Sequence, residues 1–224
     1  MYIPVPNLLN TAELAQIDNI LSIGKFTSGK ITATGAAKEV KNNEQLARED
    51  QQTAFINQII EQALMQSPIF REATQTKAVL PFLISRYLPG MEYGWHVDNP
   101  LSGANNMMIR ADMSITIFLT GPDEYDGGEL EIETESETRL FKMNKGDAII
   151  YPTTKIHRVK PVTQGTRVVA VSWIQSLIKN TEQRDLLFQM KSMEQMLSQQ
   201  QQGSPIHLLA QQINSNLLRM FIEM

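Results

Sequence analysis

The chain has 224 residues, of which 42% are hydrophobic and 20% are charged, and it contains no cysteine. This composition is typical of one soluble globular domain with or without an appendage, and the lack of cysteine excludes disulfides, thiolate metal ligands and iron–sulfur clusters. The formal net charge of −4 argues against a nucleic-acid-binding surface, because such surfaces are usually basic.

The first part of the chain is predicted to be helical. One helix begins after Asn10, and a second covers residues 55–64 and is closed by Pro68. Short extended pieces and turns are expected between them, over residues 26–35. No apolar stretch approaches the roughly 20 residues of a membrane helix, and no targeting pattern begins the chain, so we expect a cytoplasmic protein without a membrane partner.

From about residue 77 the pattern changes to short β-type runs separated by turn residues such as Asp126-Gly127-Gly128. Strands are predicted over residues 79–88, 92–97, 113–119, 129–132, 148–151, 156–159 and 167–174. Many short strands without intervening helices indicate a sandwich or barrel, and so an α+β protein with a mainly β core. Two helices with a break near 203–205 are then predicted as a C-terminal extension over 178–224.

Three residues form a candidate metal site. His96 and Asp98 are two apart in a predicted strand, so their side chains share one face and can bind one ion. His157 lies in another predicted strand, and opposite walls of a small barrel would bring it close. Two imidazoles and one carboxylate leave three positions of an octahedral ion open, as in the non-haem Fe(II) oxygenases.

Arg167 is a candidate anchor for a carboxylate ligand. It shares its predicted strand face with three apolar residues, Val169, Val171 and Trp173. A guanidinium among apolar neighbours needs an anionic partner, and its planar fork fits a carboxylate with two hydrogen bonds. A dicarboxylic keto acid could chelate a metal at one end and bind Arg167 at the other.

The motif His96-x-Asp98, His157 and Arg167, with the segments 86–98, 110–119, 125–130, 151–152, 157–162, 165–167 and 173–176, resembles the bacterial PKHD-type hydroxylases. These are relatives of the prolyl 4-hydroxylases among the iron(II)- and 2-oxoglutarate-dependent dioxygenases. The resemblance extends from about residue 80 to 177. Departures such as Asn99-Pro100 and Met107-Met108 affect expected substrate contacts and leave the metal ligands in place.

The resemblance implies a double-stranded β-helix, or jelly-roll, in a domain over 1–177, with N-terminal helices over about 1–76 and the β-helix core over about 77–177. It further implies that His96, Asp98 and His157 bind Fe(II), that Arg167 binds 2-oxoglutarate, and that O2 is the oxidant. The reaction would hydroxylate a peptide, an amino acid or a small metabolite and convert 2-oxoglutarate to succinate. The prolyl hydroxylase branch also uses L-ascorbate, or vitamin C, to rescue oxidised iron.

Other residues have two interpretations each. Tyr87 is either a second hydrogen-bond donor to the keto acid or a buried core tyrosine, and Trp173 is either a pocket wall or ordinary packing. His207 is expected at the surface or at a helix cap. The segment 99–112 beside the predicted metal site is expected to be a lid over the substrate, or else a simple connection.

Two alternative functions remain at this point. One is a cupin-like metal enzyme without a keto acid, although cupins usually present His-x-His with a glutamate and this chain has His96-Val-Asp98. The other is a β-barrel binding module without catalysis, which the full set of candidate ligands disfavours. The C-terminal helices either form a homodimer interface or pack on the core, and their apolar stripes fit both.

Overall fold

The computed structural model describes the chain except for residues 34, 48–50, 105–106, 135 and 224. The described part is mainly β-structure, with six α-helices and one short 3-10 helix, η1 (Gly29–Thr32). The α-helices are α1 (Thr11–Ile23), α2 (Ala36–Glu39), α3 (Gln51–Gln66), α4 (Pro68–Thr74), α5 (Thr181–Gln201) and α6 (Pro205–Phe221). None of the described helices is both long and apolar enough to cross a membrane.

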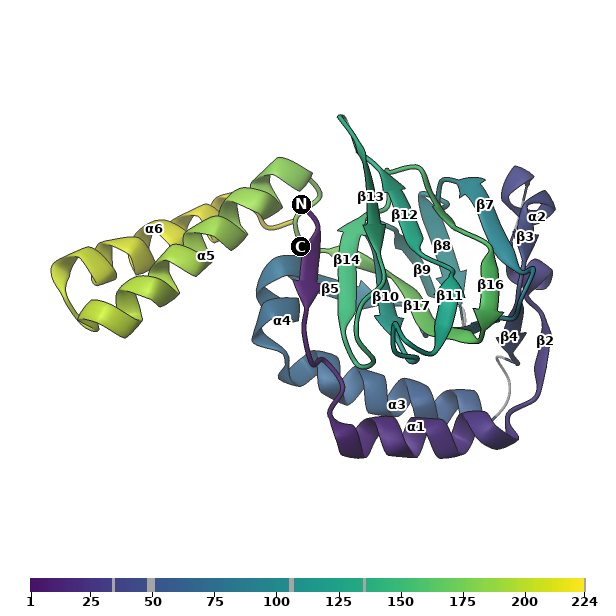
Figure 1. Cartoon of the computed structure of the whole chain (residues 1–224). Coiled ribbons are helices and arrows are strands. Elements are labelled where there is room, and N and C mark those ends of the chain that lie inside the picture. Colours follow the sequence, from purple (N-terminus) through teal and green to yellow (C-terminus); the bar gives the residue numbers. More distant parts are fainter. Residues whose placement is uncertain (34, 48–50, 105–106, 135, 224) are drawn as a thin grey trace.

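Two larger β-sheets face each other (Figure 1). The first has the order β1 (Ile3–Val5), β14 (Ala148–Pro152), β10 (Met113–Phe118), β17 (Arg167–Ser176), β6 (Leu83–Tyr87), β4 (Glu44–Leu46) and β2 (Phe26–Ser28), with β5 (Thr76–Val79) also paired to β17. The second has the order β13 (Thr138–Phe141), β12 (Leu130–Glu133), β15 (His157–Val159), β7 (Glu92–His96) and β3 (Lys41–Asn42). Two further pairs join β11 (Tyr125–Gly127) to β16 (Val162–Gly165) and β8 (Leu101–Ala104) to β9 (Met107–Arg110).

The first sheet is buried on both faces, which explains why its central strands contain so few charges. In β10 every residue is buried. Because strand side chains alternate, Ile115 and Ile117 pack with the helices, whereas Phe118 packs with the second sheet. The described part of the chain has two hydrophobic cores. The first lies between this sheet and helices α1, α3 and α4, which contribute Ile17, Ile60, Phe70 and other apolar residues. The second core lies between the sheets, where it surrounds the candidate site.

The predicted elements agree with the structure in type, with instructive differences in extent. The two N-terminal helices are confirmed, but Pro68 not only ends α3: it also occupies the first turn of α4, where a missing N–H costs nothing. The predicted strand 79–88 is two strands, β5 and β6, separated around Pro81. Segment 99–112 is not a plain loop, since it holds β8 and β9; its residues 105–106 lie outside the described part.

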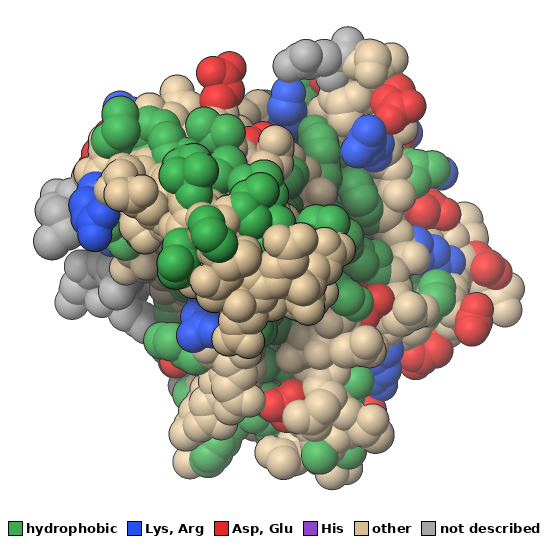
Figure 2. Space-filling view, turned by 90° about the vertical axis from the view of Figure 1, so that its left-hand side faces the viewer, with side chains coloured by type: hydrophobic (Ala, Val, Ile, Leu, Met, Phe, Trp, Pro, Cys, Tyr) green, Lys and Arg blue, Asp and Glu red, His purple; other side chains and the backbone are tan. Residues whose placement is uncertain are grey.

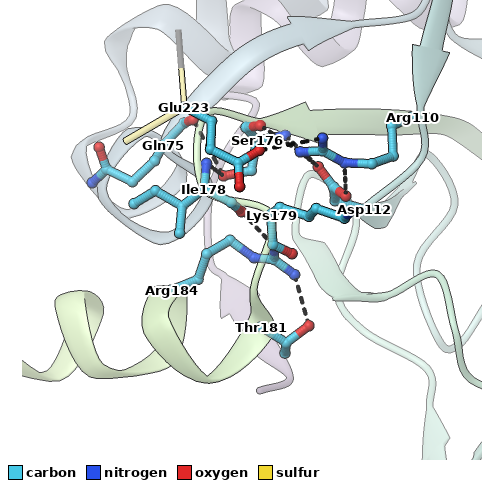
Figure 3. Close-up of polar contacts among 9 residues, drawn as sticks. All are labelled: Gln75, Arg110, Asp112, Ser176, Ile178, Lys179, Thr181, Arg184 and Glu223. Carbon is cyan, nitrogen blue, oxygen red and sulfur yellow. Dashed lines mark hydrogen bonds and ion pairs between the residues drawn. The ribbon is translucent and has the colours of Figure 1, made fainter. Parts of the chain in front are cut away.

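The α5–α6 hairpin projects from the β-structure at one side of the molecule (Figure 1). At its base the guanidinium of Arg184 donates to two backbone carbonyls before α5 and to the hydroxyl of Thr181. The chain returns there, and Arg110, which is hydrogen-bonded through two nitrogens to Asp112, also forms an ion pair with Glu223 (Figure 3). Both ends of the hairpin are therefore fixed to the same edge of the β-structure.

Candidate metal centre and adjoining cavity

The three candidate metal ligands converge at one point of the second sheet. Strands β7 and β15 are adjacent and antiparallel, and His157 lies directly opposite His96. Asp98 follows two residues after His96, and one possible ligand atom from each residue lies within 4.8 Å of the others. The expectation that His157 approaches from an opposite wall is wrong, because direct strand pairing brings the two histidines together.

Hydrogen bonds orient all three side chains toward the centre. Nδ1 of His96 lies 2.8 Å from the carbonyl oxygen of Gly94, and Nδ1 of His157 lies 3.0 Å from that of Lys155. In the tautomer in which Nδ1–H donates to these carbonyls, both Nε2 lone pairs face Asp98, at 3.9 and 3.7 Å from its carboxylate oxygens. This orientation is the one that metal-binding histidines adopt.

The environment of His96 keeps its imidazole neutral. Burial, with a smaller contribution from His157, lowers the pKa of His96 to about 4, against the opposing effect of Asp98. At neutral pH the ring therefore has a lone pair available without losing a proton. The ring of Tyr93 stacks on His96 at 3.6 Å between centroids, and Tyr151 meets His157 edge-on at 5.3 Å.

Asp98 is held from the opposite sheet. The hydroxyl of Ser114, on β10, donates to Oδ2 of Asp98 at 2.7 Å. Such a contact fixes the carboxylate, whose Oδ1 faces Nε2 of His96 and whose Oδ2 faces Nε2 of His157. Ser114 gave no signal in the sequence, because its relation to Asp98 depends on which strands face each other.

Arg167 lies at the deep end of the space between the sheets. It is the first residue of β17 and is 1% exposed. Its guanidinium carbon lies 5.0 Å from the ring centroid of Tyr87 and 5.9 Å from that of Phe118. Nε and Nη1 are buried without a hydrogen-bond partner in the described structure, and so is the hydroxyl of Tyr125. A buried cation with two unpaired donors fits an anionic ligand.

The turn at Gly127-Gly128 makes room for this arginine. Both glycines have positive φ, and Gly128 has φ of +65°. A Cβ at Gly128 would lie 3.0 Å from Cδ of Arg167 and 3.1 Å from the ring of Tyr125. The predicted turn therefore has a second purpose, since glycine lets the backbone pass close to the buried guanidinium.

One cavity of about 590 Å³ joins the three candidate ligands to Arg167. Tyr87 lies beside Arg167 as its cross-strand partner, and Trp173 lines the same cavity with a buried indole N–H that has no hydrogen-bond partner. Burial raises the pKa of Tyr87, opposed by the nearby guanidinium, so its phenol keeps its proton and can donate. Two imidazoles and a carboxylate with an open side, next to a buried arginine, fit Fe(II) and a dicarboxylic keto acid.

His207 belongs to a different part of the structure. It is buried rather than at the surface, in the first turn of α6, where its Nδ1 accepts a hydrogen bond from the backbone N–H of Gly203 in the preceding turn. The expected capping role agrees with this contact, whereas the expected surface position is wrong. Tyr93 and Tyr125 were missed by the sequence analysis, because tyrosines are equally common in ordinary β cores.

Comparison with known proteins adds independent findings. Residues 82–175 match the 2OG-Fe(II) oxygenase superfamily. PKHD-type hydroxylases of Gloeothece citriformis and Thermosynechococcus vestitus are each 39% identical over 223 residues, covering 100% of both chains.

Solved structures show the same fold at low sequence identity. An oxidoreductase of the 2OG-Fe(II) oxygenase family from Burkholderia pseudomallei has a TM-score of 0.55 at 19% identity, over 78% of this chain and 84% of the other. A Pseudomonas putida prolyl-4-hydroxylase has a TM-score of 0.54 at 13% identity, over 78% and 92%. A Trichoplax adhaerens prolyl hydroxylase, solved with a hypoxia inducible factor peptide fragment, has a TM-score of 0.54 at 13% identity, over 83% and 86%.

Proposed function

The chain belongs to the PKHD-type hydroxylases of the 2OG-Fe(II) oxygenase superfamily, and from this premise we propose that His96, Asp98 and His157 bind Fe(II) and that Arg167 binds 2-oxoglutarate. One observation carries the proposal. The cavity that contains the three converging ligands ends at a buried guanidinium with two unpartnered donors. Metal and keto acid can therefore occupy one continuous space.

The enzyme is an Fe(II)- and 2-oxoglutarate-dependent hydroxylase. When bound, iron supplies the oxidising chemistry in which O2 and 2-oxoglutarate convert a substrate C–H bond to C–OH and yield succinate and CO2. The residues of the chain position these reactants. His96, Asp98 and His157 would hold the metal from one side, and the fork of Arg167 would bind the far carboxylate of the keto acid. At the end of the cavity where Tyr87 and Arg167 are 3% and 1% exposed, burial excludes bulk water.

Two further side chains of the cavity, Tyr87 and Trp173, contact the keto acid and the substrate. The phenol of Tyr87 donates to the same distal carboxylate as Arg167, because the two residues are cross-strand partners and burial keeps the phenol protonated. Trp173 forms the wall nearer to the open side, where its free indole N–H is available to a substrate. The dioxygenase domain covers residues 1–177, with a double-stranded β-helix core over about 77–177, and the hairpin over 178–224 is an appendage.

The substrate is a peptide or a small molecule that enters from the side lined by β8, and a lid movement of the β8–β9 hairpin stays a prediction. The test is to supply Fe(II), 2-oxoglutarate and O2 together with pools of peptides and free amino acids. We expect succinate formation that depends on all three, and one candidate substrate that gains one oxygen atom in mass. Ascorbate should prolong turnover without being consumed in proportion to product.

The control for this assay is a His157→Ala variant. It should form no succinate, whereas turnover by this variant at the rate of the unmodified enzyme would contradict the proposed ligand set. If the enzyme oxidised a substrate in a metal-dependent reaction without 2-oxoglutarate, that result would favour the cupin-like alternative instead.

We also propose that the hairpin mediates a homodimer. On α6, Ile206, Leu209, Ile213 and Met220 share one exposed face, and apolar side chains gather on the side of the molecule from which the hairpin projects (Figure 2). Two such hairpins packed about a twofold axis would form a four-helix bundle.

Light scattering after size-exclusion chromatography tests the homodimer. A double Leu209→Glu and Ile213→Glu variant should be monomeric. Ser215→Glu, at an exposed position on the opposite side of α6, is the matched control and should remain dimeric. An unmodified chain that is monomeric at micromolar concentration would contradict this proposal.

A further inference from the structure

The segment from Lys41 to Gln45 presents polar side chains to the interior in strict alternation. Lys41, Asn43 and Gln45 are buried, at 5%, 3% and 4% exposure, and all three line the cavity. Asn42 between them is exposed. The segment crosses from β3 in the second sheet to β4 in the first, so it closes the space between the two sheets at one edge.

Strand register places Asn43 in line with the candidate carboxylate site. Gln45 pairs with Ser85 across β4 and β6, and one residue further along Glu44 pairs with Arg86. Extending this register by one more residue places Asn43 beside Tyr87. Tyr87 in turn is the partner of Arg167 across β6 and β17. Asn43, Tyr87 and Arg167 therefore form a row across adjacent strands, with all three side chains on the cavity face.

The side-chain amide of Asn43 is buried, and its polar atoms lack a hydrogen bond of good geometry within the described part of the chain. Neither Nδ2 nor Oδ1 makes a well-aligned hydrogen bond in the described structure, although the amide lies near enough to the Tyr87 phenol to lower its pKa. By contrast, the buried amide of Gln45 has two hydrogen-bond partners: it donates to the hydroxyl of Ser85 at 3.0 Å and accepts from the hydroxyl of Thr32 at 2.7 Å. The fold can thus satisfy a buried amide on this segment, and at Asn43 it leaves one open.

The surroundings of Asn43 hold its amide in place and favour an anion. A Cβ at Gly29 would collide with the Asn43 amide, so glycine at that position allows the amide to lie against the backbone. Burial raises the pKa of Tyr87, and the guanidinium of Arg167 and the amide of Asn43 both oppose this increase. Both neighbours therefore stabilise negative charge at the position of the phenol oxygen.

We infer that Asn43 is a further binding residue for the distal carboxylate of the keto acid. A carboxylate has about four lone-pair positions, of which the fork of Arg167 uses two, and this leaves positions for the Tyr87 hydroxyl and the Nδ2–H of Asn43. The N-terminal segment therefore contributes to selection of a ligand that carries a carboxylate at this distance from the metal. The inference rests on the proposed binding of 2-oxoglutarate by Arg167.

The test compares two ligands that differ only in the distal carboxylate. These are 2-oxoglutarate and 2-oxopentanoate, which has the same carbon chain and a methyl group in place of that carboxylate. Binding is measured by calorimetry on full-length protein loaded with Mn(II), which accepts octahedral coordination and gives a readout independent of turnover. The variants are Asn43→Ala and the isosteric Asn43→Asp. Asn42→Ala is the matched control, because this neighbouring asparagine is exposed.

Asn43→Ala should weaken 2-oxoglutarate binding about tenfold, which corresponds to the loss of one hydrogen bond to a charged group. Asn43→Asp should weaken it further, because the new carboxylate repels the ligand, while 2-oxopentanoate binding changes less than twofold in both variants. Asn42→Ala should bind both ligands normally. Circular dichroism confirms that each variant is folded, and Asn43→Ser replaces any variant that is not.

Two results would overturn the inference alone. These are unchanged 2-oxoglutarate affinity in the Asn43 variants, and an equal loss of affinity for both ligands, which would indicate a purely structural residue. An Arg167→Met variant that retains full affinity for 2-oxoglutarate would instead overturn the proposed function, and the inference with it.

Discussion

Replacement of Arg167 by methionine should stabilise the ligand-free protein and also remove its response to 2-oxoglutarate. The two effects have one cause. Arg167 is 1% exposed, and its Nε and Nη1 have no hydrogen-bond partner in the described structure. Without a ligand, the protein therefore bears the cost of a desolvated charge. Methionine has a similar length and no charge, so it can fill much of the same space.

The magnitudes follow from the contacts. Substitution of buried ionic groups by apolar ones can stabilise a protein by about 1–4 kcal/mol. The rings of Tyr87 and Phe118 already offset part of the cost here, so we expect a gain of about 1–2 kcal/mol. For a domain of this size, that gain raises Tm by roughly 2–8 °C.

The effect on the ligand has the opposite sign. Loss of two charge-assisted hydrogen bonds at about 1.5–3 kcal/mol each raises the Kd for 2-oxoglutarate at least about 100-fold. A concentration of about 100 Kd stabilises the unmodified protein by about 2.7 kcal/mol, and the same concentration would stabilise the variant by only about 0.4 kcal/mol.

Thermal unfolding of the Mn(II)-loaded protein, with and without 2-oxoglutarate, measures both effects. Arg86→Met is the matched control, because Arg86 lies next to Tyr87 in β6 but is partly exposed and paired with Glu44 at 2.6 Å. This control should lose about 1 kcal/mol or less and keep its full response to the ligand. A ligand-free Arg167→Met protein that is several kcal/mol less stable, or one that still responds fully, would refute the reasoning.

Three other substitutions test separate parts of the structure. Ser114→Ala removes the hydroxyl that donates to Asp98, and metal titration should show affinity roughly tenfold lower. Gly128→Ala places a side chain at φ of +65° and against Arg167, so denaturant unfolding should show a loss of about 1–2 kcal/mol, and calorimetry should show weaker 2-oxoglutarate binding with unchanged metal affinity. Asn57→Ala breaks the buried amide contacts that join α3 to the backbone before β6, which should cost about 3 kcal/mol and leave ligand binding unchanged. A Ser114→Ala protein with full metal affinity, a Gly128→Ala protein with full ligand affinity, or an Asn57→Ala protein of normal stability would contradict the corresponding contact.

The sequence was most informative where strand alternation and scarcity of histidine coincided. His96 and Asp98 are two apart, so their convergence follows from local geometry alone. His157 was expected near His96 and Asp98, but from an opposite wall of the barrel instead of from the adjacent strand, because local patterns do not reveal which strands are adjacent. The pairing of β7 with β15 joins segments about 60 residues apart, and only the tertiary fold determines it.

Short extended pieces were expected over residues 26–35, where β2 lies, but β3 and β4 could not be predicted for a physical reason. Strands of two or three residues, such as β3 and β4, are too short to show hydrophobic alternation. Their inward side chains are also polar, as at Lys41 and Asn43, so the usual apolar signal is absent. The amphipathic helices α1 and α3 were predictable, since each has several apolar residues at helical spacing.

Anaerobic addition of Fe(II) and then 2-oxoglutarate to the isolated enzyme tests the central claim most directly. A keto acid chelated to iron gives a visible charge-transfer absorption. We expect this absorption to saturate at one equivalent of each per chain, and to be lost in His157→Ala. No absorption in the unmodified protein, or equal absorption in the variant, would contradict the assignment of His96, Asp98 and His157 as the iron ligands.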